Sequence, residues 1–206
     1  MASLKQKMEQ AGLFGLSRLD AAAFCLACAE RVRPIVSQLA SDDTIALYDD
    51  ALEAGWATLP SSGESTRIKK LLTEIRGSRD VTSEPARRTF YVKAPLATLH
   101  HALLALSSGS ATKEAQNAWC LTVGLARDCD YHLRKYCKEP STYPLQELTC
   151  EDLENDGIEE TLRILAECAG NSEKVRKQLR PESVTRAHHL LAAVARIDEA
   201  GGFGSK

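Results

Sequence analysis

The sequence predicts an all-α protein, an irregular bundle of about eight helices packed as antiparallel hairpins. Apolar residues recur at helical spacing along most of the 206 residues, and no segment of strand length alternates apolar with polar residues. Aromatic residues make up only 5% of the chain, whereas alanine and leucine are abundant. This composition favours helix-on-helix packing, because sheets prefer β-branched and aromatic residues.

The length and composition predict one domain. A chain of 206 residues with 44% hydrophobic residues can bury a core of its own. We expect a single helical domain over residues 1–200 and a flexible tail over 201–206, where glycines are frequent. The helix pairs 18–59 and 95–138 each end in a segment with one of the two tryptophans, which is compatible with a duplicated hairpin.

Helix boundaries follow from residues that commonly begin or end helices. Ser17, Ser110 and Thr149 stand before apolar-periodic segments, where they can cap a helix. Pro95 and Pro181 are placed at helix starts, where proline is tolerated. After an amphipathic lead-in over residues 1–15, the expected helices span residues 18–40, 42–59, 65–76, 95–107, 111–138, 150–169, 172–179 and 181–199.

Three places depart from this regular pattern. Pro34 lies inside the first long helix, where the loss of a backbone donor predicts a kink or a break near Arg33. Gly157 is a point at which the helix over 150–169 could divide. Residues 78–93 have poor periodicity and are predicted as a loop with one or two helical turns.

Charge and cysteine content narrow the class of protein. The net charge is −2, which gives no general attraction to nucleic acid or to an anionic membrane. We find neither an apolar run of about 18 residues nor a secretory leader in the sequence. The seven cysteines are odd in number and lie mostly within helical patterns, which indicates reduced thiols. The expectation is a cytoplasmic protein that binds neither nucleic acid nor membrane.

Cysteine and histidine residues supply one candidate metal site. Cys25 and Cys28 are three residues apart on one predicted helix, and Cys129 and His132 have the same spacing on another. Positions three apart share a helix face, so the four side chains could form a Cys₃His zinc site. The competing interpretation, which we favour, is that these thiols are small buried hydrophobic groups, since the flanking residues are apolar.

Catalytic motifs are absent from the sequence. The adjacent pairs His100–His101 and His188–His189 point about 100° apart on a helix and cannot easily chelate one ion. No serine or cysteine stands in a nucleophile elbow, and no glycine-rich loop follows a strand. We therefore predict no catalytic residue, no metal ligand and no cofactor.

Acidic residues gather in two segments and supply the candidate partner-binding residues. The first set is Asp42, Asp43, Asp49, Asp50 and Glu53, and the second is Glu151, Asp152, Glu154 and Asp156. One interpretation is that both are ordinary solvated helix faces, with acids in the first turns serving the helix dipole. The other is an acidic docking surface for a basic partner, because complementary charge raises association rate and specificity.

The hairpin over residues 18–59 also carries a family resemblance. The string AAAFCLACAERVRPIVSQLASDD, followed by DDALEAGWATL, resembles the opening of bacterial all-α immunity proteins encoded beside polymorphic toxins. The matching residues are Cys28, Ala29, Glu30, Arg31, Val32, Pro34, Asp42, Asp43, Ala51, Ala54 and Trp56.

The resemblance implies an all-α cytosolic protein without catalysis of its own. Such a protein would bind a cognate toxin domain and occlude or distort its active site. If the toxin were a basic nuclease, the acidic surfaces could stand in for substrate phosphates. The alternative function is a small helical metal-binding protein or enzyme that uses the helix-borne cysteines and histidines; the oligomeric state is left open.

Overall fold

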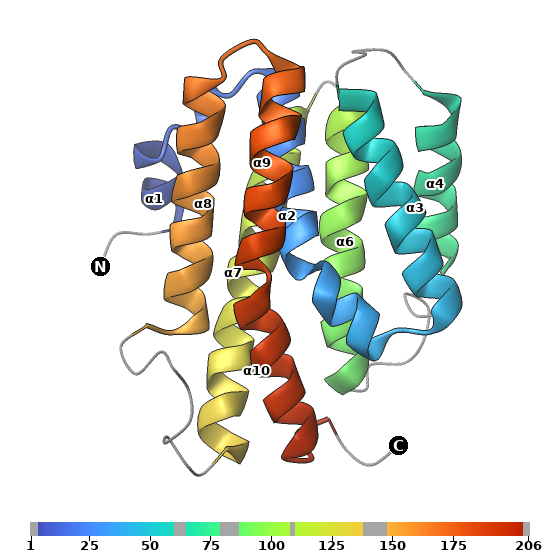
Figure 1. Cartoon of the computed structure of the whole chain (residues 1–206), viewed down its shortest axis with the longest axis vertical. Coiled ribbons are helices and arrows are strands. Elements are labelled where there is room, and N and C mark those ends of the chain that lie inside the picture. The colour runs from blue at the N-terminus through green and yellow to red at the C-terminus, as the bar shows by residue number, and fades with distance from the viewer. Residues whose placement is uncertain (1–3, 60–64, 79–86, 108–109, 138–147, 204–206) are drawn as a thin grey trace.

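The computed structural model describes residues 4–59, 65–78, 87–107, 110–137 and 148–203 (Figure 1). This part of the chain forms helices and contains no strand, which confirms the all-α prediction. The elements are α1 (Leu4–Gln10), the 3₁₀ helix η1 (Leu13–Gly15), α2 (Arg18–Leu39), α3 (Asp42–Thr58), α4 (Thr66–Gly77), α6 (Arg87–Ser107), α7 (Ala111–Tyr136), α8 (Cys150–Glu167), α9 (Ser172–Arg186) and α10 (His188–Glu199). Their buried apolar residues join into one core.

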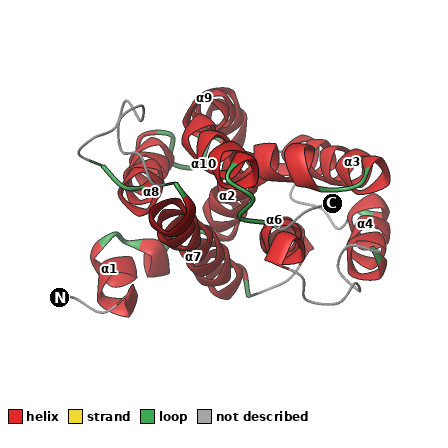
Figure 2. Ribbon diagram, turned by 90° about the horizontal axis from the view of Figure 1, so that it is seen from below, coloured by secondary structure: helices red, strands yellow, loops and turns green. Residues whose placement is uncertain are grey.

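Helix α2 forms the centre of the bundle. Every residue from Ala21 to Val32 is buried, so this helix has no solvent face over three turns. It contacts α3, α6, α7, α8, α9 and α10, which surround it in Figure 2. Its many alanines are small and let the neighbouring helices approach closely. A helix that is apolar on all sides is stable only when it is enclosed, as α2 is here.

Pro34 bends α2 without ending it. The helix continues from Arg18 to Leu39, although Pro34 has no N–H to donate to the carbonyl of Glu30. In Figure 1 the C-terminal part of α2 turns towards α3. The expected kink is therefore present, whereas a break is not.

Two other prolines were expected at helix starts and instead lie inside helices. Helix α6 begins at Arg87 and runs through Pro95, so residues 87–93 are helical rather than part of a loop; residues 79–86 lie outside the described part. Tyr91 is fully buried there and meets the ring of Phe203 at 4.8 Å between centroids. Helix α9 likewise runs through Pro181. In both cases burial of the flanking residues outweighs one lost backbone hydrogen bond.

The end of the described chain is packed rather than mobile. Gly202 donates its N–H to the carbonyl of Ile197 at 2.7 Å, and Phe203 is 9% exposed. A Cβ added at Gly202 would lie 2.5 Å from Cγ2 of Ile197, so only glycine fits this turn. The expectation of a flexible tail is thus wrong for residues 201–203, and residues 204–206 lie outside the described part.

Among the helices that the structure describes, none combines the length and the apolar content needed to cross a bilayer.

Candidate functional site

A buried ion pair joins α2 to α8. Arg31 on α2 and Glu154 on α8 are both fully buried, and Oε1 of Glu154 accepts from Nε of Arg31 at 3.0 Å and lies 2.9 Å from Nη2. Arg31 also donates to Oγ1 of Thr161 at 3.0 Å and to Sγ of Cys28 at 3.3 Å. Burial, the largest single influence, disfavours the charged guanidinium, but the contacts with Glu154 and Cys28 together outweigh it, so the pKa of Arg31 is raised.

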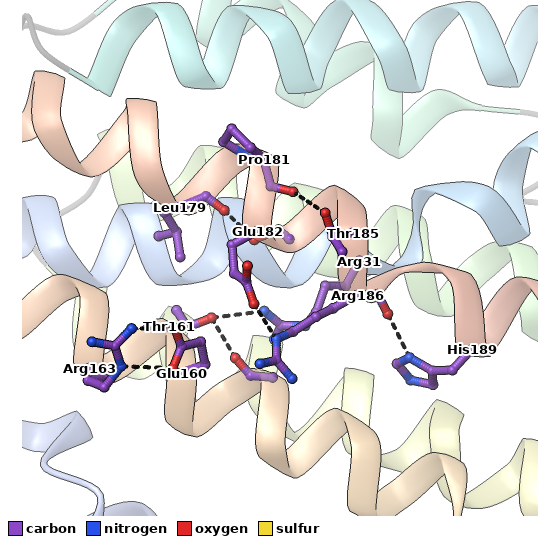
Figure 3. A network of polar contacts seen from close by, with 12 residues as sticks. Arg31, Glu160, Thr161, Arg163, Leu179, Pro181, Glu182, Thr185, Arg186 and His189 are labelled. Carbon is purple, nitrogen blue, oxygen red and sulfur yellow. Dashed lines mark hydrogen bonds and ion pairs between the residues drawn. The ribbon is translucent and has the colours of Figure 1, made fainter. Parts of the chain in front are cut away.

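This pair determines which face of α8 points inward. Figure 3 shows Arg31 beside Thr161, with Arg186 of α9 next to it. A Cβ at Gly157 would lie 3.3 Å from Cδ of Arg31 and 3.4 Å from Cδ of Arg186, so the glycine makes room for both arginines. Helix α8 is continuous through Gly157, where a division was considered. Glu154, Gly157, Ile158 and Thr161 share the inner face, whereas Asp156 and Glu159 are exposed on the opposite face.

The outward face of α8 forms one wall of a groove of about 570 Å³. Its other walls come from the α1–η1 connection and from α7. Carboxylates, amides and apolar groups line it: Gln10, Ala11, Trp119, Leu148, Asp152, Asn155, Asp156 and Glu159. The indole of Trp119 is 3% exposed and packs against Phe24, with 6.1 Å between the ring centroids.

Two carboxylates of this groove, those of Asp156 and Glu159, have no cationic partner among the described residues. The lining of the groove contains no lysine or arginine among the residues that the structure describes. Asp156 and Glu159 are exposed, and no ion pair involving either is formed within the described ranges. Asp152 completes a capping box, in which its Oδ2 accepts from the backbone N–H of Thr149 at 3.0 Å. The groove therefore carries a local excess of negative charge.

Other acids of α8 are paired with arginines or buried. Glu151 accepts two hydrogen bonds from Arg127, at 2.6 and 2.9 Å. Glu160 accepts two from Arg163, which lower the pKa of Glu160. Glu154 was expected on a docking surface, and this expectation is corrected by its full burial against Arg31. The face of the helix on which an acid lies, and not the number of acids nearby, decides whether a partner can reach that acid.

The first acidic group, on α3, lies on the opposite side of the molecule from α8 (Figures 1 and 2). Asp49 accepts a bidentate contact from Arg33, at 2.7 and 2.8 Å. Asp50 pairs with Arg67 of α4. The structure therefore does not bring the two predicted acidic groups together.

Glu53 belongs to a cluster that links α3 to α2 and α9. Arg180 donates to Glu53, with 2.7 Å between Nη2 and Oε2, and this contact lowers the pKa of Glu53. The same arginine lies 3.6 Å from Oε2 of Glu30, which also accepts from the indole N–H of Trp56 at 2.8 Å. Burial raises the pKa of Glu30, and the contacts with Trp56 and Arg180 offset only part of this effect.

Asp42 and Asp43 are exposed and are the members of the α3 group that form no ion pair within the described ranges. They occupy the first turn of α3, where they favour the helix dipole. The N-cap of α3 is Ser41.

The Cys₃His zinc site is not assembled. Cys25, Cys28, Cys129 and His132 lie in the described part, where no group of three or more histidine, cysteine, aspartate or glutamate side chains is placed to hold a metal ion. Cys25, Cys28 and Cys129 are fully buried, as the interpretation as small hydrophobic groups predicts. Burial raises the pKa of Cys28 to about 12, with Arg31 acting against it, so the thiol stays protonated.

Several residues that shape the site were not singled out from the sequence. Gln10, Trp119 and Asn155 line the groove but stand on three separate segments. Arg31 is different, because a charged residue inside the otherwise apolar α2 is a signal that a buried partner exists.

The chain was also compared with known proteins. No family model matches it, and neither a curated protein nor a solved structure was found to be similar.

Proposed function

We propose that this chain is an immunity protein: a cytoplasmic helical protein without catalysis of its own that binds a cognate bacterial toxin domain and inhibits it by direct contact. The resemblance of residues 18–59 to all-α immunity proteins supports this class. The structural observation that supports it most is the groove of α8, where Asp156 and Glu159 face solvent without a cationic partner in the described residues.

An unneutralised acidic groove suits a basic partner. Nucleases and other enzymes that bind phosphate carry positive potential at their active sites, so carboxylates of an inhibitor can take the place of the substrate phosphates. Specific complexes bury roughly 1,200–2,000 Å² in total, which means that the groove would be the centre of a wider contact. The exposed rim of α8 and the neighbouring Leu148 would supply part of that contact.

Of the two predicted acidic groups, we favour the one on α8 as the docking surface. Asp49, Asp50 and Glu53 each have an arginine partner within the fold, so a toxin would have to displace that arginine to use the carboxylate. Asp42 and Asp43 keep their charge exposed but do not line the groove of α8. They remain a smaller second candidate surface.

The experiment that tests the proposal uses the gene beside the one for this chain. Its product, in particular a large secreted protein with a variable C-terminal domain, is expressed with and without this chain in a sensitive bacterium. We expect the C-terminal domain to stop growth, co-expression to restore it, and the two proteins to elute together in size-exclusion chromatography. A toxic domain that neither binds this chain nor is neutralised by it would contradict the proposal.

A further inference from the structure

We propose that the groove between the α1–η1 connection, α7 and α8 is the docking site for a lysine- or arginine-rich segment of the partner protein. This inference rests on the proposed function, because it names the part of the toxin that the groove would hold. Three properties of the groove carry it: its size, its mixture of acidic and apolar groups, and its firm support by the core.

The size suits a few side chains of a segment rather than a flat surface. Ligand sites in proteins are commonly about 300–1,000 Å³, and the groove of about 570 Å³ lies in that range. A single strand or helix turn of a partner can place two or three side chains in such a space. The rest of the partner would then contact the rim.

The chemistry of the lining matches long cationic side chains. Ala11, Trp119 and Leu148 are apolar, whereas Asp152, Asp156 and Glu159 are acidic. Lysine and arginine combine an aliphatic stem with a charged end, so they can contact both kinds of group at once. A purely apolar segment would satisfy only the apolar groups, and an acidic segment would be repelled by the carboxylates.

Hydrogen-bonding groups in the lining suit a peptide main chain. The amides of Gln10 and Asn155 can both donate and accept. Trp119 lines the groove, and its buried indole N–H has no acceptor within the described part of the chain. A main-chain carbonyl seated against the indole is an acceptor of the required kind, and an unmade buried hydrogen bond costs about 1–3 kcal/mol.

The core holds the acidic wall of the groove in place. Arg31 connects Glu154 and Thr161, one on each side of Gly157, so α8 is pinned to α2 over two turns. Asp156 and Glu159 lie on the same two turns and face outward. A preorganised wall lowers the entropy lost on binding, which allows a small groove to bind a segment selectively.

The test is a titration of the intact chain, labelled with ¹⁵N, with a decalysine peptide at low ionic strength. The chain has two tryptophans, so its spectrum holds two indole N–H signals, and the variant Trp119→Phe assigns them. We expect the peptide to shift the indole signal of Trp119 and the amides of α8, and to leave the indole of Trp56 unchanged. A decaglutamate peptide should shift neither.

A matched pair of variants separates the groove from general charge. The double variant Asp156→Lys/Glu159→Lys should weaken binding of decalysine about tenfold or more, whereas Asp42→Lys/Asp43→Lys, with the same change in net charge, should change it by less than about twofold. The neutral variant Asp156→Asn/Glu159→Gln should fall between them. Circular dichroism and thermal melts confirm that each variant is folded.

Defined outcomes would overturn the inference. It fails if decalysine leaves the signal of Trp119 unchanged, or if the variants of α3 and α8 weaken binding equally. It also fails if spermine binds the groove as tightly as the peptide, which would indicate a site for a small polyamine. These results are independent of the toxin assay: neutralisation without groove binding overturns the site alone, whereas groove binding without neutralisation overturns the proposed function alone.

Discussion

Helices α3 and α8 carry similar clusters of acidic residues, yet the fold treats their charges in opposite ways. On α3, Asp49, Asp50 and Glu53 are each paired with an arginine from another helix. On α8, Glu154 is drawn into the core, while Asp156 and Glu159 are left exposed beside a groove. Two segments that look equivalent in sequence thus have different roles, because the arginines that neutralise them come from distant parts of the chain.

The contrast between α3 and α8 shows that the number of acids in a segment says little about the charge of its surface. A carboxylate paired with arginine is partly neutralised and already has its hydrogen bonds, so it offers less to a partner. A buried carboxylate such as Glu154 contributes to stability only together with its counter-ion. Substitutions in the two helices should therefore have effects that follow pairing and burial.

The largest effect is expected at the buried pair. Replacing Glu154 by alanine leaves the guanidinium of Arg31 buried without its carboxylate and should lower the free energy of unfolding by about 3–5 kcal/mol. Urea unfolding followed by circular dichroism measures the loss. Glu159→Ala on the exposed face is the control and should lie within about 0.5 kcal/mol of the parent chain.

A double variant sharpens this prediction. Because Oε2 of Glu154 is buried without a hydrogen-bond donor in the described part, the pair is not fully satisfied. Arg31→Met/Glu154→Leu should therefore recover most of the stability that Glu154→Ala loses, since an apolar replacement of a buried pair is often neutral. Equal losses for the single and double variants would argue against an unpaired charge as the cause.

A smaller effect is expected from the glycine on the inner face of α8. Gly157→Ala places a methyl group 3.3 Å from Cδ of Arg31, whose bonds to Glu154 and Thr161 prevent it from moving aside. On α7, Gly124 has open space, so Gly124→Ala should stabilise the protein by up to about 1 kcal/mol through helix propensity.

The two glycine variants are compared by the difference between their free energies of unfolding. Gly157→Ala should be less stable than Gly124→Ala by about 1–3 kcal/mol, the usual cost of overpacking. Chemical denaturation of both variants gives this value. If the two alanines stabilised the protein equally, Arg31 would not be closely packed against α8.

The surface acids should differ by less. Asp49→Ala removes a bidentate partner of Arg33 and should cost about 0.5–1 kcal/mol, because both side chains are about 40% exposed. Asp156→Ala removes no partner and should be neutral or slightly stabilising, within about 0.5 kcal/mol. Both positions lie within helices, so the difference between their unfolding free energies isolates the contribution of the ion pair. Raising the salt concentration should reduce this difference.

The smallest effect is a pH dependence at the cluster behind α3. Burial raises the pKa of Glu30, so the folded state holds this proton more tightly than the unfolded chain does. Stability should therefore fall as pH rises from about 4.5 through the raised pKa, and Glu30→Gln should remove that decline. Glu53 has the opposite sign, since Arg180 lowers its pKa; Glu53→Gln should instead reduce the loss of stability as the solution is acidified.

Urea unfolding at a series of pH values from 4 to 8 measures both slopes. The prediction for Glu30 is wrong if Glu30→Gln and the parent chain lose stability in parallel as the pH rises. Because Glu53 is largely exposed, its contribution should also be reduced by salt, whereas that of buried Glu30 should not.

Much of the fold could be predicted from local patterns. The helical period and the caps at Ser17 and Thr149 were predicted correctly, because caps and apolar spacing act within a few residues. Pro95 and Pro181 were misplaced as helix starts, because the burial of the residues around them exceeds the cost of one missing donor. That burial depends on contacts far away in sequence.

The candidate site was predicted only in part. Asp152 and Asp156 were identified as surface acids, but Glu154, two residues from each, proved to be inside the core. The groove could not be foreseen, since Gln10, Trp119 and Asn155 come together only through the packing of α1, α7 and α8.

The sequence by itself determined that this chain is helical, where most of its helices begin and that its charge is balanced overall. Those properties depend on hydrogen bonds and side-chain spacing within single turns. The tertiary structure decided that α2 is enclosed on all sides, which acids meet an arginine and which remain open to a partner. Electrostatic neutralisation acts between side chains brought within about 4 Å of each other, and the distance along the chain between them can exceed one hundred residues, as it does for Arg31 and Glu154.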